Sequence, residues 1–268
     1  MKKIPQGTHI ESTKTLRAPG ALLLALEGRA PFEFGAMLAA WPLLRMAPQG
    51  DGHAVLVFPG LAAPDFTTQP LRNYLRGRGY ETYGWDQGFN FGPREGVLAQ
   101  CVERFRALRA QSGRKVSLIG WSLGGIYARE IAKMFAQDVR CVITLGTPFS
   151  GNPKANNAWR LYEFASGHKL DKPEQFAHMR VAPRVPTTSI FSRSDGVVAW
   201  QCSFQKESPL AENIEVVTSH VGMGLHPSAL FAVADRLAQA EGKWKRFELG
   251  GWRTWFYRDT SQLADPCV

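Results

Sequence analysis

The stretch VSLIGWSLGG, residues 116–125, joins a short apolar run to a Gly-x-Ser-x-Gly core, and a helix-forming segment follows it over residues 126–136. This pattern predicts a sharp turn from a strand into a helix, in which Ser122 takes strained backbone angles and projects its hydroxyl from the end of a sheet. A side chain at Gly120 or Gly124 would collide with the neighbouring strand or helix, so the turn requires small residues there. Ser122 is therefore a candidate nucleophile, and an ordinary structural turn is the alternative.

Apolar runs bounded by turn residues recur along the chain, as is typical of strands buried on both faces of a parallel sheet. Besides the run that leads into Ser122, they lie at residues 54–58, 80–85, 139–145, 186–192 and 213–217. Segments suited to covering helices alternate with them, at residues 67–78, 95–110, 126–136 and 229–240. The alternation predicts an α/β fold with a mostly parallel central sheet flanked by helices.

Length and composition favour one domain over residues 1–268. A chain of 268 residues with 44% hydrophobic and 21% charged residues can bury a full α/β core, and no repeat or linker divides it. No apolar run approaches the roughly 20 residues that a bilayer span needs. A signal peptide also fits poorly, because polar and mixed-charge residues separate Lys2 and Lys3 from the apolar run at 21–26. We therefore expect a cytoplasmic protein.

Charge and cysteine content limit the partners. The net charge of +9 would suit an anionic surface such as lipid headgroups or nucleic acid. The basic residues are scattered and no nucleic-acid module is recognisable, so we expect no nucleic-acid partner. Solvated faces are the plainer interpretation, with an anionic membrane surface as the alternative. The four cysteines are far apart and form no C-x-x-C pair, so neither a disulfide framework nor a metal site is expected; they are Cys101, Cys141, Cys202 and Cys267.

Three segments stand outside the alternation. Residues 1–50 are predicted to form a short N-terminal helical segment, whose apolar residues recur at helical spacing and are expected to pack on the core rather than bind lipid. Residues 150–185 are predicted to be a mostly helical lid or cap insertion, which covers the core, lines an acyl pocket, or both. Residues 241–268 are aromatic and contain Gly250-Gly251, which predicts a hairpin extension. The residues of the first segment that recur at helical spacing are Phe32, Phe34, Met37, Leu38, Trp41 and Leu44.

A serine hydroxyl near neutral pH requires a base, and the base requires a group that fixes its tautomer. Asp195 and His220 each follow a predicted strand, and the chain order Ser122, Asp195, His220 places them as acid and base. His226 shares a loop with His220 and is the alternative base, although it abuts Pro227 and is expected to open a helix. Other acids are less well placed, because they lie in the insertion or around a strand: Asp171, Glu212 and Glu215.

These motifs resemble those of the α/β-hydrolase superfamily, and more narrowly those of serine esterases and lipases, including lipase-like proteins similar to the eukaryotic GPI-inositol deacylase. The resemblance covers about residues 53–240. Phe149 and Pro59 depart from it, because many such lipases carry histidine at the corresponding places. The motifs that carry the resemblance are Phe58-Pro59-Gly60-Leu61, residues 120–125, Leu145-Gly146-Thr147-Pro148, residues 194–198 and residues 219–223.

The resemblance implies a serine carboxylic ester hydrolase that acts on hydrophobic or lipid-like esters through an acyl-enzyme, without metal or organic cofactor. It also implies an oxyanion hole formed by the backbone N–H groups of Leu61 and Leu123. An acyltransferase or polyester depolymerase with the same triad is one alternative, and a non-catalytic surface-binding protein on the same fold is another. The sequence leaves the acyl preference and the oligomeric state open.

Overall fold

Six parallel strands form the central sheet, in the order β2-β1-β3-β4-β5-β6. Each strand overlaps its predicted run, so the prediction of a parallel α/β sheet is confirmed. All strands except the edge strand β2 are buried along their whole length, and in β1, β3 and β4 the buried positions are mainly apolar. The strands are β1 (Ala54–Phe58), β2 (Glu81–Gly84), β3 (Val116–Trp121), β4 (Val139–Leu145), β5 (Thr187–Phe191) and β6 (Ala211–Glu215).

The structure is a computed structural model, and it describes residues 16–171, 173–261 and 263. Residues 1–15 of the expected N-terminal segment lie outside the described residues. The same holds for Cys267 and for the other residues of the expected C-terminal extension at 262 and 264–268. Among the helices of the described part, none is long and apolar enough to cross a membrane.

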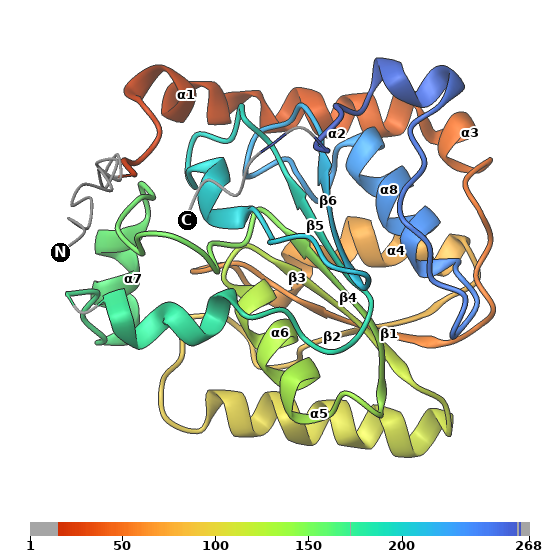
Figure 1. The fold of residues 1–268 in the computed structure, drawn as a ribbon, viewed down its shortest axis with the longest axis horizontal. Helices are drawn as coiled ribbons and strands as arrows, with labels where there is room; N and C mark the ends of the chain where they lie inside the picture. Colours follow the sequence, from red (N-terminus) through yellow and green to blue (C-terminus); the bar gives the residue numbers. More distant parts are fainter. Residues whose placement is uncertain (1–15, 172, 262, 264–268) are drawn as a thin grey trace, which may run out of the picture.

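Helices cover both faces of the sheet (Figure 1). On one face lie α5 (Val97–Ser112) and α6 (Gly124–Met134), and on the other lie α4 (Gln69–Gly77) and α8 (Pro227–Leu237). Alternate residues of a strand pack against different helical layers, because successive side chains point to opposite faces of the sheet. Val55 and Val57, for example, pack toward α4 and α8, whereas Leu56 packs toward α5 and α6. Short 3-10 helices precede α4 and follow β5, at η2 (Asp65–Thr68) and η4 (Trp200–Ser203).

The described part of the N-terminal segment is helical, with its apolar side turned largely outward. It comprises α1 (Ala21–Ala25), η1 (Leu26–Arg29), α2 (Ala30–Ala39) and α3 (Trp41–Leu44), and both α2 and α3 pack against α8. Ala30, Glu33 and Met37 form the buried side of α2. The predicted packing holds for Met37 and Leu44 and, in part, for Trp41; it is wrong for Phe32, Phe34 and Leu38, which are exposed.

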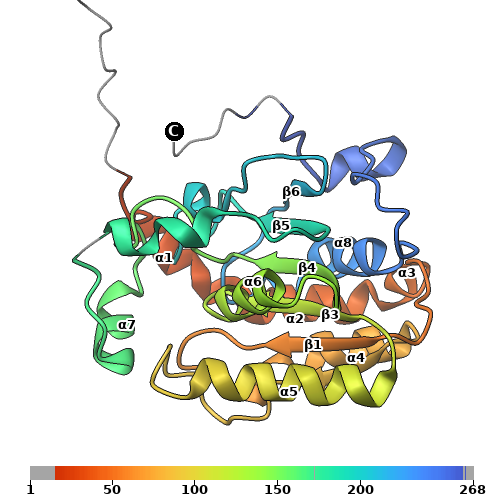
Figure 2. The ribbon, with the colours of Figure 1, turned by 60° about the horizontal axis from the view of Figure 1, so that its bottom comes forward.

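Residues 150–185, between β4 and β5, contain α7 (Trp159–Ser166) and the 3-10 helix η3 (Pro173–Arg180). In Figure 2 the arrows of β1 and β4 point toward the side of the molecule where α1 and α7 lie. The carboxyl ends of the strands, where ligands of such sheets gather, therefore face the insertion and the N-terminal helices.

The predicted C-terminal hairpin is wrong. Gly251–Trp255 forms the 3-10 helix η5, and within the described residues the one backbone bridge between the tail and the sheet joins Glu215 and Arg258. Side-chain contacts with α8 hold the tail instead of strand pairing. The Trp252 ring stands edge-on to Phe231 with ring centroids 4.9 Å apart, and Arg253 pairs with Asp235 at 2.8 Å.

Candidate active site

Ser122 occupies the turn between β3 and α6 in the strained conformation that its motif predicts. Its φ is +52°, in the left-handed region that non-glycine residues rarely adopt, and its N–H donates to the Leu145 carbonyl at 2.7 Å. A Cβ at Gly120 would lie 2.2 Å from the Gly125 Cα, and one at Gly124 would lie 2.4 Å from the Phe58 carbonyl oxygen. The close packing of this turn against β1 and α6 therefore requires both glycines.

The structure brings Ser122, His220 and Asp195 into one hydrogen-bonded line. His220 Nε2 lies 2.9 Å from Ser122 Oγ, and His220 Nδ1 lies 2.7 Å from Asp195 Oδ2. The other carboxylate oxygen of Asp195 accepts the N–H groups of Val197 at 2.8 Å and Val198 at 2.7 Å. Asp195 is thus fixed by its own loop through Oδ1, and Oδ2 is directed at the imidazole of His220.

The electrostatic surroundings of His220 favour its protonated form. Burial by itself lowers the pKa of the imidazole, but the charge of Asp195, the hydrogen bond to Asp195 and the charge of Glu27 raise it. The net pKa lies above the ordinary value for histidine. A histidine in this setting can take a proton from Ser122 and hold it while charge develops on a bound substrate.

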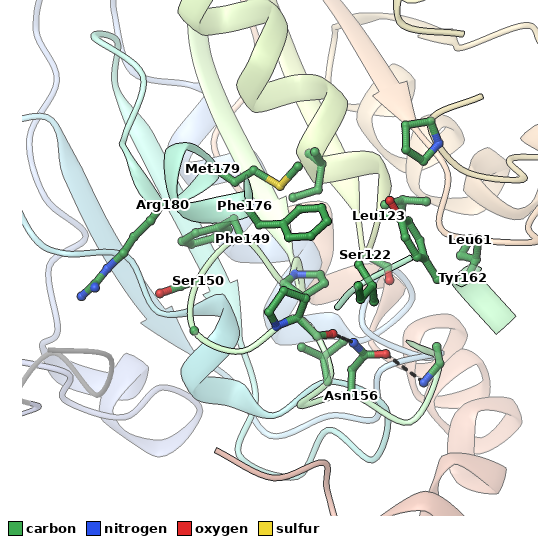
Figure 3. A pocket seen from close by; sticks show the side chains of 18 of the residues that line it. Leu61, Ser122, Leu123, Phe149, Ser150, Asn156, Tyr162, Phe176, Met179 and Arg180 are labelled. Atoms are coloured by element: carbon green, nitrogen blue, oxygen red, sulfur yellow. Dashed lines mark hydrogen bonds between the residues drawn. The ribbon is translucent and has the colours of Figure 1, made fainter. Parts of the chain in front are cut away.

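Leu61 and Leu123, the residues predicted to supply oxyanion donors, line the same cavity as Ser122 (Figure 3). Leu61 follows β1, and Leu123 directly follows Ser122. Within the residues that the structure describes, neither backbone N–H has a hydrogen-bond acceptor. Neither donor is therefore used by the described part of the fold itself.

The alternative base and acids are engaged elsewhere. His226 caps α8, where its Nδ1 accepts the Ser228 N–H and lies 2.7 Å from Ser228 Oγ. Burial also lowers the pKa of His226, opposite to the net shift at His220. Each alternative acid forms an ion pair away from Ser122; the pairs are Asp171 with Lys154, Glu212 with Arg236 and Glu215 with Arg193.

A second hydrogen-bonded serine, histidine and aspartate occurs elsewhere in the molecule. His53 lies 2.6 Å from Asp51 Oδ1 through Nδ1 and 2.8 Å from Ser117 Oγ through Nε2. Ser117 is fully buried within β3 and lines none of the cavities described here. This line therefore has no access for a substrate, and it stabilises the start of the sheet.

The cavity at Ser122 has a volume of about 330 Å³ and is mainly apolar. Phe149, Leu170, Phe176 and Met179 are among the apolar residues that line it. Figure 3 shows the side chains of Phe176 and Met179 at the same cavity as Ser122. Tyr162, Phe176 and Met179 of the insertion line the cavity. Phe164 does not, because its side chain faces solvent.

Three charged residues that the sequence analysis did not single out surround the loops of Asp195 and His220. They are Glu27, Arg29 and Glu33, the only charged residues between positions 21 and 44. Glu27 accepts the N–H of His220 at 2.9 Å, Arg29 donates to Ser194, and Glu33 accepts the N–H of Ser219 at 2.8 Å. The sequence indicated that these three residues have partners, because isolated charges in an apolar segment need them, but it did not indicate which partners.

Across the part of the chain that the structure describes, no group of three or more histidine, cysteine, aspartate or glutamate side chains could hold a metal ion.

A serine at a strained strand-to-helix turn, a histidine and an aspartate after later strands, and a parallel sheet between two helical layers together define the α/β-hydrolase class of proteins. The chain belongs to the alpha/beta hydrolase family, whose model matches residues 50–261. The N-terminal helices up to residue 49 lie outside that match. A search of curated proteins found no match.

Solved structures of lipases and esterases share the fold. Lipase B of Aspergillus fumigatus is 18% identical with a TM-score of 0.55, and the match covers 72% of this chain and 54% of that one. Esterase Pf2001 of Pyrococcus furiosus is 13% identical with a TM-score of 0.51, covering 72% and 83%. The mature lipase BlEst2 of Bacillus licheniformis is 17% identical with a TM-score of 0.50, covering 69% and 91%. This chain therefore spans only about half of the Aspergillus lipase.

Proposed function

We propose that the protein is a serine carboxylic ester hydrolase with Ser122 as nucleophile, His220 as base and Asp195 as the acid that orients the base. The observation that carries the proposal is the line Ser122–His220–Asp195 at an apolar cavity that also contains Leu61 and Leu123. Membership of the alpha/beta hydrolase family and the fold shared with lipases and esterases support it.

Acylation would begin when His220 Nε2 takes the proton of Ser122 Oγ and this oxygen bonds to the ester carbonyl carbon. The carbonyl electron pair moves to its oxygen, which the N–H groups of Leu61 and Leu123 stabilise; one such donor is typically worth about 10²–10³-fold in rate. The carbon–oxygen bond to the alcohol then breaks, and His220 gives the leaving oxygen its proton. An acyl-Ser122 ester remains.

Deacylation repeats these steps with water. His220 accepts a proton from water, the resulting oxygen bonds to the acyl carbon, and the bond to Ser122 Oγ breaks as His220 returns the proton to Ser122. Asp195 stays ionised and stabilises the imidazolium in both halves. The free acid leaves, and the starting state is restored.

The cavity favours a hydrophobic acyl group. Leu170, Phe176 and Met179 offer it apolar contacts, and burial of each CH₂ group contributes about 0.8 kcal/mol. We infer that residues 150–185 act as a lid or cap over the acyl group. The apolar residues of the insertion and the net charge of +9 favour lipid-like esters, and the motifs around Ser122 and Asp195 resemble those of lipase-like proteins similar to GPI-inositol deacylase.

The test that needs no knowledge of the substrate is intact-mass detection of a fluorophosphonate adduct. We expect one adduct on the parent protein, none on Ser122→Ala, and labelling slowed by about 10²–10⁴-fold on His220→Ala, because general-base catalysis contributes that much. Ser117→Ala serves as the matched control and should label like the parent. A folded parent protein that gains no adduct, with or without detergent, would contradict the proposal and favour a non-catalytic binding protein.

An acyltransferase or a polyester depolymerase would use the same residues. Once an ester substrate is known, an added alcohol distinguishes the first, because a transferase forms the new ester faster than the free acid. Release of soluble acids from a polyester film distinguishes the second.

We further propose an anionic membrane surface as the partner of the outward face of α1, α2 and α3. Glu27, Arg29 and Glu33 turn inward, whereas Leu22 is 75% and Phe32 is 79% exposed. Apolar residues on the outer face of such helices and a net charge of +9 together suit the interface of a negatively charged bilayer.

A further inference from the structure

The N-terminal helices bind the two loops that carry Asp195 and His220, although these helices precede the residues matched by the family model. Glu27, at η1, contacts both loops. Its Oε1 accepts the N–H of Gly196 at 2.7 Å and the N–H of His220 at 2.9 Å. Its Oε2 accepts the N–H of Val221 at 2.9 Å. One carboxylate therefore joins the residue after Asp195 to the backbone of His220 itself.

We propose that Glu27 is a positioning residue for His220, because its carboxylate fixes the Asp195 loop and the His220 loop relative to each other and thereby sets the distance from His220 Nε2 to Ser122 Oγ. This inference rests on the function proposed above. It concerns the backbone of the two loops, and Glu27 touches none of the reacting atoms.

Arg29 and Glu33 support the same two loops from neighbouring turns. The Arg29 guanidinium donates to both the carbonyl and the hydroxyl of Ser194 at 2.9 Å and pairs with Glu33 at 3.2 Å. Glu33 accepts the N–H and the hydroxyl of Ser219, and the hydroxyl of Thr218 at 3.1 Å. Each of the three charged residues thus reaches a residue directly beside Asp195 or in the loop of His220.

The close approach of the N-terminal helices to the Asp195 loop is built into the backbone. A Cβ at Gly196 would lie 2.1 Å from the Leu23 carbonyl oxygen, so only glycine allows α1 to lie against this loop. Other contacts also join the loops, since the hydroxyls of Ser192 and Ser194 both donate to the Thr218 carbonyl. Those contacts end two residues before His220, whereas Glu27 binds the His220 N–H directly.

Glu27 also acts on His220 through its charge. The charged groups around the imidazole are Asp195, Glu27 and, farther along the same segment, Glu33 with its partner Arg29. Burial lowers the pKa of His220, while Asp195 and then Glu27 raise it. Removal of the Glu27 charge should therefore lower the pKa of His220, which an anchor of purely structural importance would not do.

The test compares Glu27→Gln with Glu248→Gln, which removes the same charge from an exposed residue paired with Lys245. The rate of fluorophosphonate inactivation is measured against pH, and the imidazole of His220 is titrated by NMR with His220→Ala for assignment. We expect the alkaline plateau of Glu27→Gln to fall by about tenfold to a hundredfold, because misplacement of a catalytic group by about 1 Å can cost 10²-fold. Its acid midpoint should move to lower pH, and Glu248→Gln should match the parent.

Glu27→Asp separates position from charge. It keeps the negative charge but shortens the side chain by one methylene, so we expect a lowered plateau with a midpoint close to that of the parent. If the plateau, the midpoint and the NMR titration of Glu27→Gln all match those of Glu248→Gln, Glu27 is only an anchor of the N-terminal helices and the inference is wrong. If the parent protein does not react at all, the proposed function fails, and the NMR titration still decides whether Glu27 acts on His220.

Discussion

At the scale of single residues, burial and the neighbouring charges together set the pKa of His220, and this pKa sets the pH range in which His220 can act as a base. The imidazole is buried, which by itself disfavours its charged form, yet its net pKa is raised because Asp195 and Glu27 lie close to it. A base with a raised pKa is stronger toward the Ser122 proton. It is also protonated, and thus inactive as a base, over a wider range of acidic pH.

This balance predicts the pH dependence of the parent protein. His220 must be neutral to accept the Ser122 proton, so the rate of fluorophosphonate inactivation should rise with pH through the pKa of His220. Because that pKa is raised, the midpoint should lie above about 6.5, the ordinary value for histidine. Inactivation rates between about pH 5 and pH 9 measure it, and a midpoint clearly below the ordinary value would contradict the assignment of His220 as base.

At the scale of elements, one buried arginine connects α6 to the insertion at residues 150–185, which lines part of the cavity. Arg129 lies on α6 and is fully buried, and burial lowers the pKa of its guanidinium to about 9. Its Nη2 donates to the carbonyls of residues 179, 180 and 181 at 3.1, 3.3 and 3.1 Å. The guanidinium carbon also lies 3.8 Å from the ring centroid of Phe149, which lines the cavity. Arg129 thus holds the end of η3 against the body of the protein.

Arg129→Met should loosen this part of the insertion. It leaves three carbonyls without their donor, and a buried polar group left unsatisfied costs about 1–3 kcal/mol. We expect faster hydrogen exchange in residues 173–185 and a KM for ester substrates raised more than kcat is lowered, because η3 forms part of the cavity wall.

Arg78→Met is the matched control for this change. Arg78 is also buried and donates to two backbone carbonyls, those of Arg45 and Ala47, on the side of α3. Its loss should increase exchange around residues 45–47 and leave residues 173–185 as in the parent. Equal exchange in residues 173–185 of both variants would show that Arg129 does not hold the insertion.

The elements that the sequence predicted well are those whose environment is uniform along their length. β1, β3 and β4 are surrounded by neighbouring strands and two helical layers, so nearly every position is apolar and the run of residues marks the strand. Ser122, Asp195 and His220 were found for a related reason. Each follows a strand, and the carboxyl ends of parallel strands meet at one edge of the sheet.

The elements that were predicted poorly depend on contacts distant in sequence. Gly250-Gly251 favoured a hairpin, but Arg253 pairs with Asp235 and lies against the rings of Phe231 and Phe247, and the chain forms η5 instead. The isolated charge of Glu27 in an apolar segment indicated a need for partners, but which loops it binds could not be predicted. Its carboxylate accepts hydrogen bonds from backbone N–H groups about 170 and 190 residues away, and contacts this distant leave no pattern in the local sequence.

At the scale of the whole molecule, the N-terminal helices invert the usual distribution of side chains. Most surface helices bury an apolar stripe and expose charges. Here Glu27, Arg29 and Glu33 bind the loops of the candidate active site, while Leu22, Phe32, Leu43 and Met46 among others face solvent. Exposed apolar residues gathered on one helical segment indicate an interaction surface. Because the inward charges serve the site, a partner bound to the outer face would lie one helix away from His220.

The proposed membrane partner predicts that this face, and not exposed apolar residues in general, drives binding. Leu22→Gln/Phe32→Gln should lose most of the co-flotation of the parent protein with phosphatidylcholine vesicles that contain phosphatidylglycerol. Leu98→Gln/Met134→Gln is the matched control, because it removes two exposed apolar residues from α5 and α6, on the opposite layer. Vesicles without phosphatidylglycerol should bind the parent more weakly, and salt should reduce the difference by screening.

Size-exclusion chromatography of the same variants separates the membrane from a second copy of the chain. A parent dimer that becomes monomeric in Leu22→Gln/Phe32→Gln, with no binding to vesicles by any variant, would identify the face as a self-interface and contradict the membrane proposal. Equal flotation of both double variants would place the lipid contact elsewhere on the molecule. Flotation lost only in Leu22→Gln/Phe32→Gln, with fluorophosphonate labelling in solution retained, would assign membrane binding to the outer side of the helices whose inner side positions His220.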